Sequence, residues 1–157
     1  MALPKLNTSN YELDLPSTGE KVKFRPWLMK EQKVLLIAQE SEDEKEIERA
    51  FADIVSVCTF GKVEPYSSPM FDIEYIFLQL RSKSVGEKIK LNVLCPDDEE
   101  TRVDIELDLK EVGVQMTEDH TNVVQLTDEI TVYMKYPTLG EMSGFSGDGQ
   151  VVQIFDM

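Results

Sequence analysis

The chain has 157 residues, of which 41% are hydrophobic and 29% are charged, and its formal net charge is −14. This balance predicts a folded protein of one domain or two small ones that buries about 70% of its unfolded surface. The negative charge repels phosphate groups, so we expect binding neither to nucleic acid nor to an anionic membrane. No apolar run approaches the roughly 20 residues that span a bilayer, and the first five residues lack a signal-peptide core. We therefore expect that the protein is made in the cytoplasm and is either used there or assembled there into something larger.

The first half of the chain predicts a hairpin followed by three helices. Alternation at residues 11–15 and 21–25, with a turn between them, predicts the hairpin. Helical spacing predicts a first helix over residues 28–40 and a second that begins with a capping box at Ser41 and Glu44 and ends near Thr59. The third helix begins at Ser68 and Pro69, and its apolar surface is broad enough to be buried on more than one side.

The second half predicts two more hairpins, at residues 88–94 with 101–109 and at 122–126 with 130–136. The predicted fold is therefore α+β, with antiparallel β-hairpins of about six strands and about three helices packed on one side. We expect one domain over residues 3–139, with subdomains 3–84 and 85–139 as the alternative. Residues 140–150 are glycine-rich and predict a flexible linker, and residues 151–157 begin an apolar element that is truncated or covered by a partner.

Side chains suited to catalysis or metal binding are scarce. Cys58, Cys95 and His120 are three possible zinc ligands without the spacing of a zinc site, so we expect no metal and no cofactor. Both cysteines are interpreted as small buried apolar residues. His120 lies in a predicted loop and no nucleophile is tied to it by spacing, so we expect no enzyme. A small hydrolase that uses His120 is the least favoured hypothesis.

Two places are candidate partner interfaces. One is Trp27 with Arg25 and Lys30, because Trp and Arg are enriched at interface hot spots. The alternative is that Trp27 fixes the first hairpin to the first helix, since Trp is usually largely buried. The other place is the apolar end of the chain, with Val151, Val152, Ile154 and Phe155. Deletion of residues 151–157 is expected to weaken partner binding without unfolding the rest.

Three segments carry a family resemblance: LPSTGEKVKFRPWLMKEQKVLLIAQES at 15–41, MFDIEYIFLQLRSKSVGEKIKLNVLCPDD at 70–98, and LTDEITVYMKYPTL at 126–139. In this order and spacing they resemble the baseplate hub protein family of T4-like contractile-tailed bacteriophages, over about residues 3 to 139. Members of that family continue with a helical C-terminal part, which residues 151–157 would begin.

The resemblance implies a protein needed to form the central hub of the tail baseplate, either as a virion component or as a factor in hub assembly. It implies other baseplate hub and tail proteins as partners, a location in the virion tail baseplate, and host cytoplasm during assembly. The alternative is a transient assembly chaperone that is absent from the mature virion. In either case we expect recognition by surface, through an acidic face and an apolar end, and no enzymatic activity.

Overall fold

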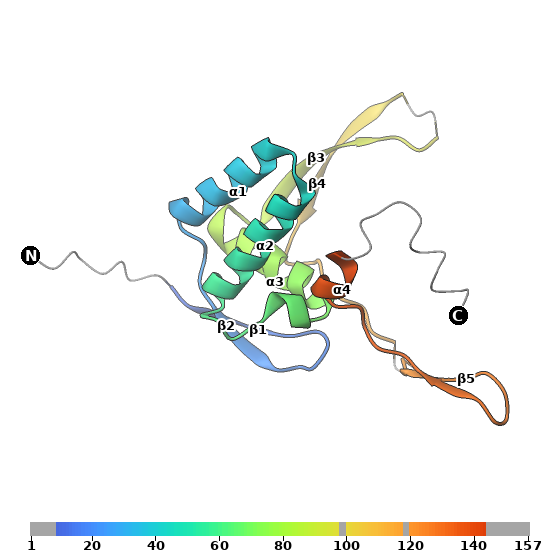
Figure 1. Ribbon diagram of the computed structural model, residues 1–157. Helices are drawn as coiled ribbons and strands as arrows, with labels where there is room; N and C mark the ends of the chain where they lie inside the picture. The colour runs from blue at the N-terminus through green and yellow to red at the C-terminus, as the bar shows by residue number, and fades with distance from the viewer. Residues whose placement is uncertain (1–8, 98–99, 118–119, 144–157) are drawn as a thin grey trace, which may run out of the picture.

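The computed structural model describes residues 9–97, 100–117 and 120–143 and has an α+β fold (Figure 1). Within these residues six strands form three antiparallel hairpins, and three long helices and one short helix accompany them. The predicted fold class is therefore confirmed. The long helices and the first hairpin form a body from which the other two hairpins project (Figure 1). No helix in the described ranges is long and apolar enough to cross a membrane.

The first hairpin contributes one of its faces to the core. It consists of β1 (Tyr11–Asp14) and β2 (Lys21–Phe24), at the predicted place. Leu13, Val22 and Phe24 are buried, and they share a face because alternate residues of a strand point the same way. The turn includes Gly19 at φ +69°, a left-handed conformation that glycine adopts without strain. The hairpin is thereby fixed with its apolar side towards the helices.

Three helices complete the core: α1 (Met29–Ser41), α2 (Glu44–Cys58) and α3 (Met70–Ser84). Residues three and four apart lie on one face of a helix, so Ile73, Ile76 and Leu80 of α3 are buried together. The core cluster consists of Leu13, Val22, Phe24, Trp27, Ile54, Val55, Cys58, Val63, Ile73, Ile76 and Leu80. It therefore joins the first hairpin to α2 and α3.

The predicted start of α2 at Ser41 is wrong. Ser41 is the last residue of α1, and its hydroxyl donates a hydrogen bond to the Ala38 carbonyl at 2.8 Å. Glu42, at φ 56°, ends α1 in the left-handed region, and Asp43 caps α2 by accepting a hydrogen bond from the Lys45 N–H at 2.9 Å. A cap residue needs a non-helical backbone, so Ser41 could not serve while α1 extended through it.

The second and third hairpins remain separate from the first and from each other. Strands β3 (Lys88–Leu94) and β4 (Arg102–Asp108) form one, and β5 (Val123–Gln125) and β6 (Thr131–Tyr133) form the other. The prediction located all four strands, with β3 at its predicted bounds and the others shorter. The three hairpins form three separate two-stranded sheets, and the core cluster joins the helices to the first of them.

A short helix brings the chain back to the body after the third hairpin. This helix, α4 (Leu139–Ser143), packs on the 3-10 turn η1 (Pro65–Ser67) and on α3. Leu139 is 4% exposed, and its N–H donates to the Ser68 carbonyl at 3.3 Å. The Ser68 hydroxyl itself donates to Glu64, so Ser68 does not cap α3 as predicted. Residues 140–143, the start of the predicted linker, thus lie in α4, and residues 144–150 lie outside the described residues.

Candidate partner-binding surface

The hairpin of β3 and β4, with its base at residues 87 and 109, is called the first arm. Its register places Ile89 opposite Leu107, Leu91 opposite Ile105 and Val93 opposite Val103. All six are apolar, and because alternate strand residues share a face they form one continuous apolar surface. Five are between 38% and 50% exposed, namely Leu91, Val93, Val103, Ile105 and Leu107. The sixth, Ile89, lies nearest the base of the arm and is half-buried.

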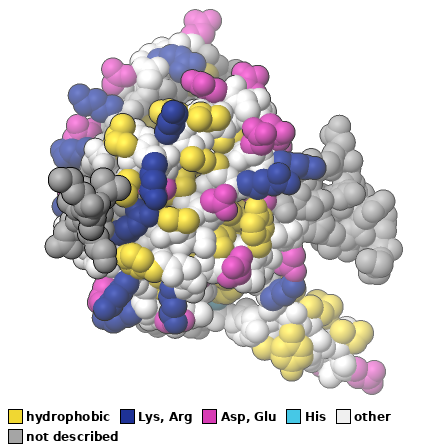
Figure 2. Space-filling model, turned by 60° about the vertical axis from the view of Figure 1, so that its left-hand side comes forward, with side chains coloured by type: hydrophobic (Ala, Val, Ile, Leu, Met, Phe, Trp, Pro, Cys, Tyr) yellow, Lys and Arg dark blue, Asp and Glu magenta, His cyan; other side chains and the backbone are white. Residues whose placement is uncertain are grey.

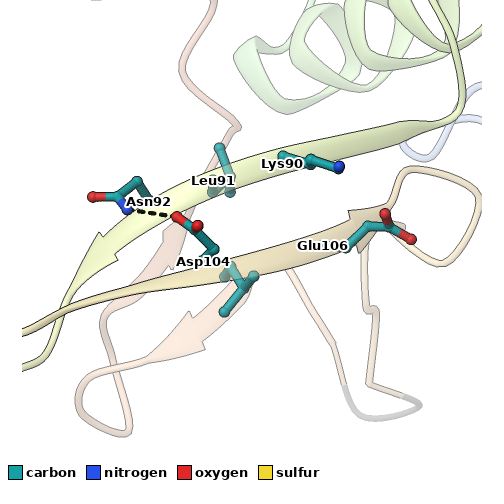
Figure 3. A pocket seen from close by; sticks show the side chains of 6 residues that line it. Lys90, Leu91, Asn92, Asp104 and Glu106 are labelled. Carbon is teal, nitrogen blue, oxygen red and sulfur yellow. Dashed lines mark hydrogen bonds between the residues drawn. The ribbon is translucent and has the colours of Figure 1, made fainter.

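The opposite face of the first arm is charged and internally paired. Asn92 donates a hydrogen bond to the Asp104 carboxylate at 2.5 Å, as the dashed line in Figure 3 shows. Lys88 and Glu106 form an ion pair at 2.6 Å, and the pKa of Lys88 is raised by its hydrogen bond to Glu106. These four polar side chains therefore bind one another in two pairs.

The open edges of the first arm also carry charge. The backbone N–H of Cys95 donates to the Thr101 carbonyl, and that of Leu109 donates to the Glu87 carbonyl, so these residues form backbone hydrogen bonds between the two strands. Because hydrogen-bonded and non-hydrogen-bonded pairs alternate along an antiparallel ladder, every second residue has its backbone N–H and C=O directed away from the partner strand. The residues whose backbone groups point away from the partner strand are Lys88, Lys90, Asn92 and Leu94 on β3, and Arg102, Asp104, Glu106 and Asp108 on β4. Charged residues at an edge discourage addition of another strand. The apolar face, rather than an edge, is thus the part suited to a partner.

The base of the first arm is anchored to the helical body. Leu109 is 1% exposed and its N–H donates to the Glu87 carbonyl at 2.7 Å. The Glu87 carboxylate pairs with Lys110 at 2.5 Å and with Lys83, at the end of α3, at 2.8 Å. Hydrogen bonds from Lys110 and then Lys83 lower the pKa of Glu87 to about 2. The arm is therefore held to α3 at its base while its apolar face stays open.

The hairpin of β5 and β6 with its flanking residues 122–134, called the second arm, is also apolar and exposed. Val123 pairs with Tyr133, which is 75% exposed, and Val124 pairs with Val132. The other exposed apolar residues of this arm are Leu126, Ile130 and Met134. Figure 2 shows apolar side chains gathered on the projecting arm at the lower right, whereas on the body they are scattered among charged ones. Two projecting hairpins thus share the same character.

The predicted interface residues near Trp27 lie mostly inside the molecule. Trp27 is 8% exposed, its ring centroid lies 5.4 Å from that of Phe77 on α3, and its backbone N–H donates to the Ser84 hydroxyl at 3.0 Å. Arg25 pairs with the buried Glu31 at 3.0 Å. Lys30 is exposed and lies 3.4 Å from the same carboxylate. Trp27 therefore joins the end of the first hairpin to α3, and Lys30 is the one member of this group that faces solvent.

Glu31 links these residues to the start of α1. Its carboxylate accepts a hydrogen bond from the Leu28 N–H at 2.7 Å as well as the pair with Arg25. Burial raises the pKa of Glu31, but the hydrogen bonds from Leu28 and Arg25 and the positive charges of Arg25 and Lys30 outweigh this, and the pKa is lowered overall. The group stabilises the junction between hairpin and helix.

The remaining sequence candidates are placed as follows. Val151, Val152, Ile154 and Phe155 lie outside the described residues. His120 is exposed and its Nε2 lies 2.6 Å from the Tyr136 hydroxyl, with the two rings stacked. Cys58 is buried, but Cys95 is only half-buried, so the expectation of a buried Cys95 is wrong. Within the described ranges no group of three His, Cys, Asp or Glu side chains could hold a metal ion.

Sequence reasoning identified the strands of both arms but did not name their apolar residues as candidate interface residues. The signal was present, because alternation at residues 88–94 and 102–108 predicts one apolar face. Alternation does not reveal whether another part of the chain covers that face.

The comparison with known families gives the identity of the chain. Residues 8–157, nearly the whole chain, match the family described as T4 bacteriophage base plate protein. No curated protein and no solved structure gives a significant match. The chain therefore belongs to the T4 bacteriophage base plate protein family, and it is a component of a phage tail baseplate that interacts with other baseplate proteins in a multi-subunit assembly.

Proposed function

We propose that the protein is a baseplate hub protein that works through protein–protein contacts alone, and that neighbouring baseplate proteins cover its two arms. The observation that carries the proposal is the open apolar face of the first arm. A two-stranded hairpin by itself is only marginally stable in water, and a contiguous apolar face that stays open to water is a candidate interaction site. Contact with a partner would stabilise the arm and remove this surface from water.

The size of the face favours insertion into a larger assembly over pairing of two copies. Each strand of the first arm has seven residues. At about 3.4 Å per residue and about 4.8 Å of width for each of the two strands, the face measures roughly 230 Å², against about 800 Å² per partner in a stable interface. The arm alone is therefore too small to hold a dimer, but it can add to other contacts within a baseplate.

The test is a substitution on the apolar face with a matched control on the charged face. Leu91→Ser with Ile105→Ser alters one cross-strand pair, and Lys90→Ser with Glu106→Ser alters the adjacent pair that points the other way. Each tagged variant is expressed during infection, and the baseplate proteins that purify with it are identified and quantified by mass spectrometry. We expect the first variant to lose most of its baseplate partners and the control to retain them. Equal recovery by both variants would contradict the proposal.

Mass spectrometry of purified particles separates the two roles that a hub protein can have. A structural component remains at constant stoichiometry in the particle, whereas an assembly chaperone is found with hub intermediates and is absent from the particle. Both roles use the same arms, so the substitution experiment holds for either.

A further inference from the structure

The helical body carries a second surface, a groove between α2, α3 and α4 with a volume of about 400 Å³. Each helix contributes residues at helical spacing. Ile47 and Phe51 lie one turn apart on α2, Met70 begins α3, and Leu139 and Met142 line the groove from α4. Leu139 is nearly buried and forms part of the floor, whereas Ile47 and Met142 are 40% and 44% exposed. The groove is therefore apolar and open to solvent.

Two carboxylates stand at this apolar groove. Glu48 follows Ile47 on α2, and Glu74 lies one turn after Met70 on α3. Neither forms an ion pair with a described residue, although the part of the chain that the structure describes contains many such pairs. No Lys or Arg lines the groove. Arg49 follows Glu48 along α2 but does not line the groove, so the site combines an apolar lining with two carboxylates that form no ion pair with a described residue.

From this combination we infer that the groove binds an amphipathic helix of another protein that presents apolar residues with Lys or Arg on either side. A helix with anchors at i, i+3, i+4 and i+7 is a common occupant of apolar grooves between helices. Its cations would pair with Glu48 and Glu74, and its apolar residues would cover Ile47 and Met142. The inference goes beyond the proposed function, because the groove lies on the body and does not involve either arm.

Charge argues against two other occupants. Residues 151–157 of the chain, VVQIFDM, are apolar but contain Asp156 and no cation. They would leave both carboxylates unpaired and add a third negative charge. A second copy carries the same net charge of −14 and the same acidic groove. Like charges brought together at an interface weaken binding, so a basic partner is favoured over both.

The probe is a fluorescein-labelled helical peptide of about 15 residues, with leucines along one face and lysines beside them. Binding to the full chain is followed by fluorescence anisotropy at about 0.15 M salt, which screens long-range attraction. Two control peptides have the same length: in one, serine replaces leucine, and in the other, glutamate replaces lysine. We expect the dissociation constant of each control to be at least about tenfold higher than that of the probe.

Substitutions in the protein locate the site. Glu48→Gln with Glu74→Gln is expected to raise the dissociation constant of the probe roughly fivefold to tenfold, since two cation pairs are lost. Glu40→Gln with Glu46→Gln removes the same charge from exposed positions outside the groove and is expected to leave binding unchanged. Met142→Ser tests the apolar lining and is expected to weaken binding in the same direction. Circular dichroism melting curves check that each variant is folded.

Several results would overturn the inference. Equal binding of the probe and the serine peptide would show general attraction of cations to an acidic protein. Equal effects of the two Glu→Gln pairs would place the peptide elsewhere. If deletion of residues 151–157 tightened probe binding by more than about tenfold, those residues would be the occupant of the groove. If Met142→Ser converted a dimer into a monomer, the occupant would be a second copy of the chain. The variant with Leu91→Ser and Ile105→Ser in the first arm should bind the probe like the unaltered chain. A failure of this test can therefore be distinguished from a failure of the proposed function.

Discussion

Ser17, in the turn of the first hairpin, is bound to Asp72, in the first turn of α3. The Ser17 backbone N–H donates to one carboxylate oxygen at 3.0 Å, and the Ser17 hydroxyl donates to the other. Asp72 is 2% exposed, so this carboxylate depends on these bonds in place of water. An acid at this place also interacts favourably with the positive end of the helix. The pair therefore connects two elements that are 55 residues apart and orients the hairpin on the core.

Removal of the Ser17 hydroxyl should destabilise the protein. Ser17→Ala leaves one oxygen of the buried Asp72 carboxylate without its donor, and we expect the free energy of unfolding to fall by about 1–3 kcal/mol. Urea denaturation followed by circular dichroism measures this. The neighbouring Thr18→Ala is the control, because Thr18 is exposed, and it should change stability by less than about 0.5 kcal/mol. An equal fall in the free energy of unfolding in both variants would show that the hydrogen bond from the Ser17 hydroxyl to Asp72 does not stabilise the fold.

The lowered pKa of Glu31 predicts a stability change at acid pH. A carboxyl group whose pKa is lower in the folded than in the unfolded chain contributes stability above its unfolded pKa, near 4.5, and loses it as pH falls through the folded value. Glu31→Gln should therefore unfold at lower urea concentration than the unaltered chain at pH 7, and this difference should shrink as pH falls below about 4.5. A difference that stays constant from neutral to acid pH would contradict the assignment.

The pairing of Glu87 at the base of the first arm can be observed directly. We expect the side-chain carboxyl carbon of Glu87 to titrate near pH 2 in a 13C NMR experiment, well below an ordinary glutamate. Of the two lysine hydrogen bonds that lower the pKa of Glu87, that from Lys110 has the larger effect, so Lys110→Ala should raise the pKa of Glu87 towards 4.5. Lys62→Ala, whose lysine pairs with Glu20, should leave it unchanged. Titration of Glu87 near 4.5 in the unaltered chain would disprove the contact.

The close approach of α4 to η1 explains the glycine at position 140. A Cβ atom there would lie 2.9 Å from the Tyr66 carbonyl oxygen, closer than such atoms can approach. Gly140→Ala should force α4 away from η1 and cost about 1–3 kcal/mol, measured by urea denaturation. Gly113→Ala is the matched change, since a Cβ there meets nothing within 4 Å. If the two variants proved equally stable, α4 would not pack against Tyr66 as described.

The two cysteines should differ in reactivity. Burial raises the pKa of the Cys58 thiol to about 11, whereas Cys95 is partly accessible at the end of the first arm. Because the thiolate is the reactive form, a thiol reagent such as DTNB should modify Cys95 quickly and Cys58 only after unfolding in urea. Cys95→Ser should then abolish the fast reaction. Fast modification that survives this substitution would place Cys58 at the surface.

Local patterns determined much of the fold. The alternation at residues 88–94 located β3 at its bounds, because a period of two belongs to a strand wherever the strand lies. The three long helices also followed from spacing, with the predicted caps at Ser41 and Ser68 misplaced, whereas α4 was not predicted. A cap depends on where the preceding element ends, and neighbouring sequence does not fix this.

The candidate site was less predictable. Trp27 was a reasonable interface candidate by residue type, but its contacts with Phe77 and Ser84 come from a helix about 50 residues away. The groove could not be predicted at all, because α4 was expected to be part of a linker and Leu139 had no recognisable partner. The alternation of residues predicted that each arm has an apolar face, but it did not predict that this face is exposed to solvent.

The sequence by itself determined the acidic charge, the identity and order of most helices and strands, and the family to which the chain belongs, since each is written in composition or in residues close together along the chain. Only the tertiary structure decided that Asp72 binds Ser17, that Trp27 is buried and that the first arm projects with its apolar face uncovered. Such contacts join residues far apart in the chain, and exposure depends on everything that packs nearby, so no local pattern specifies them.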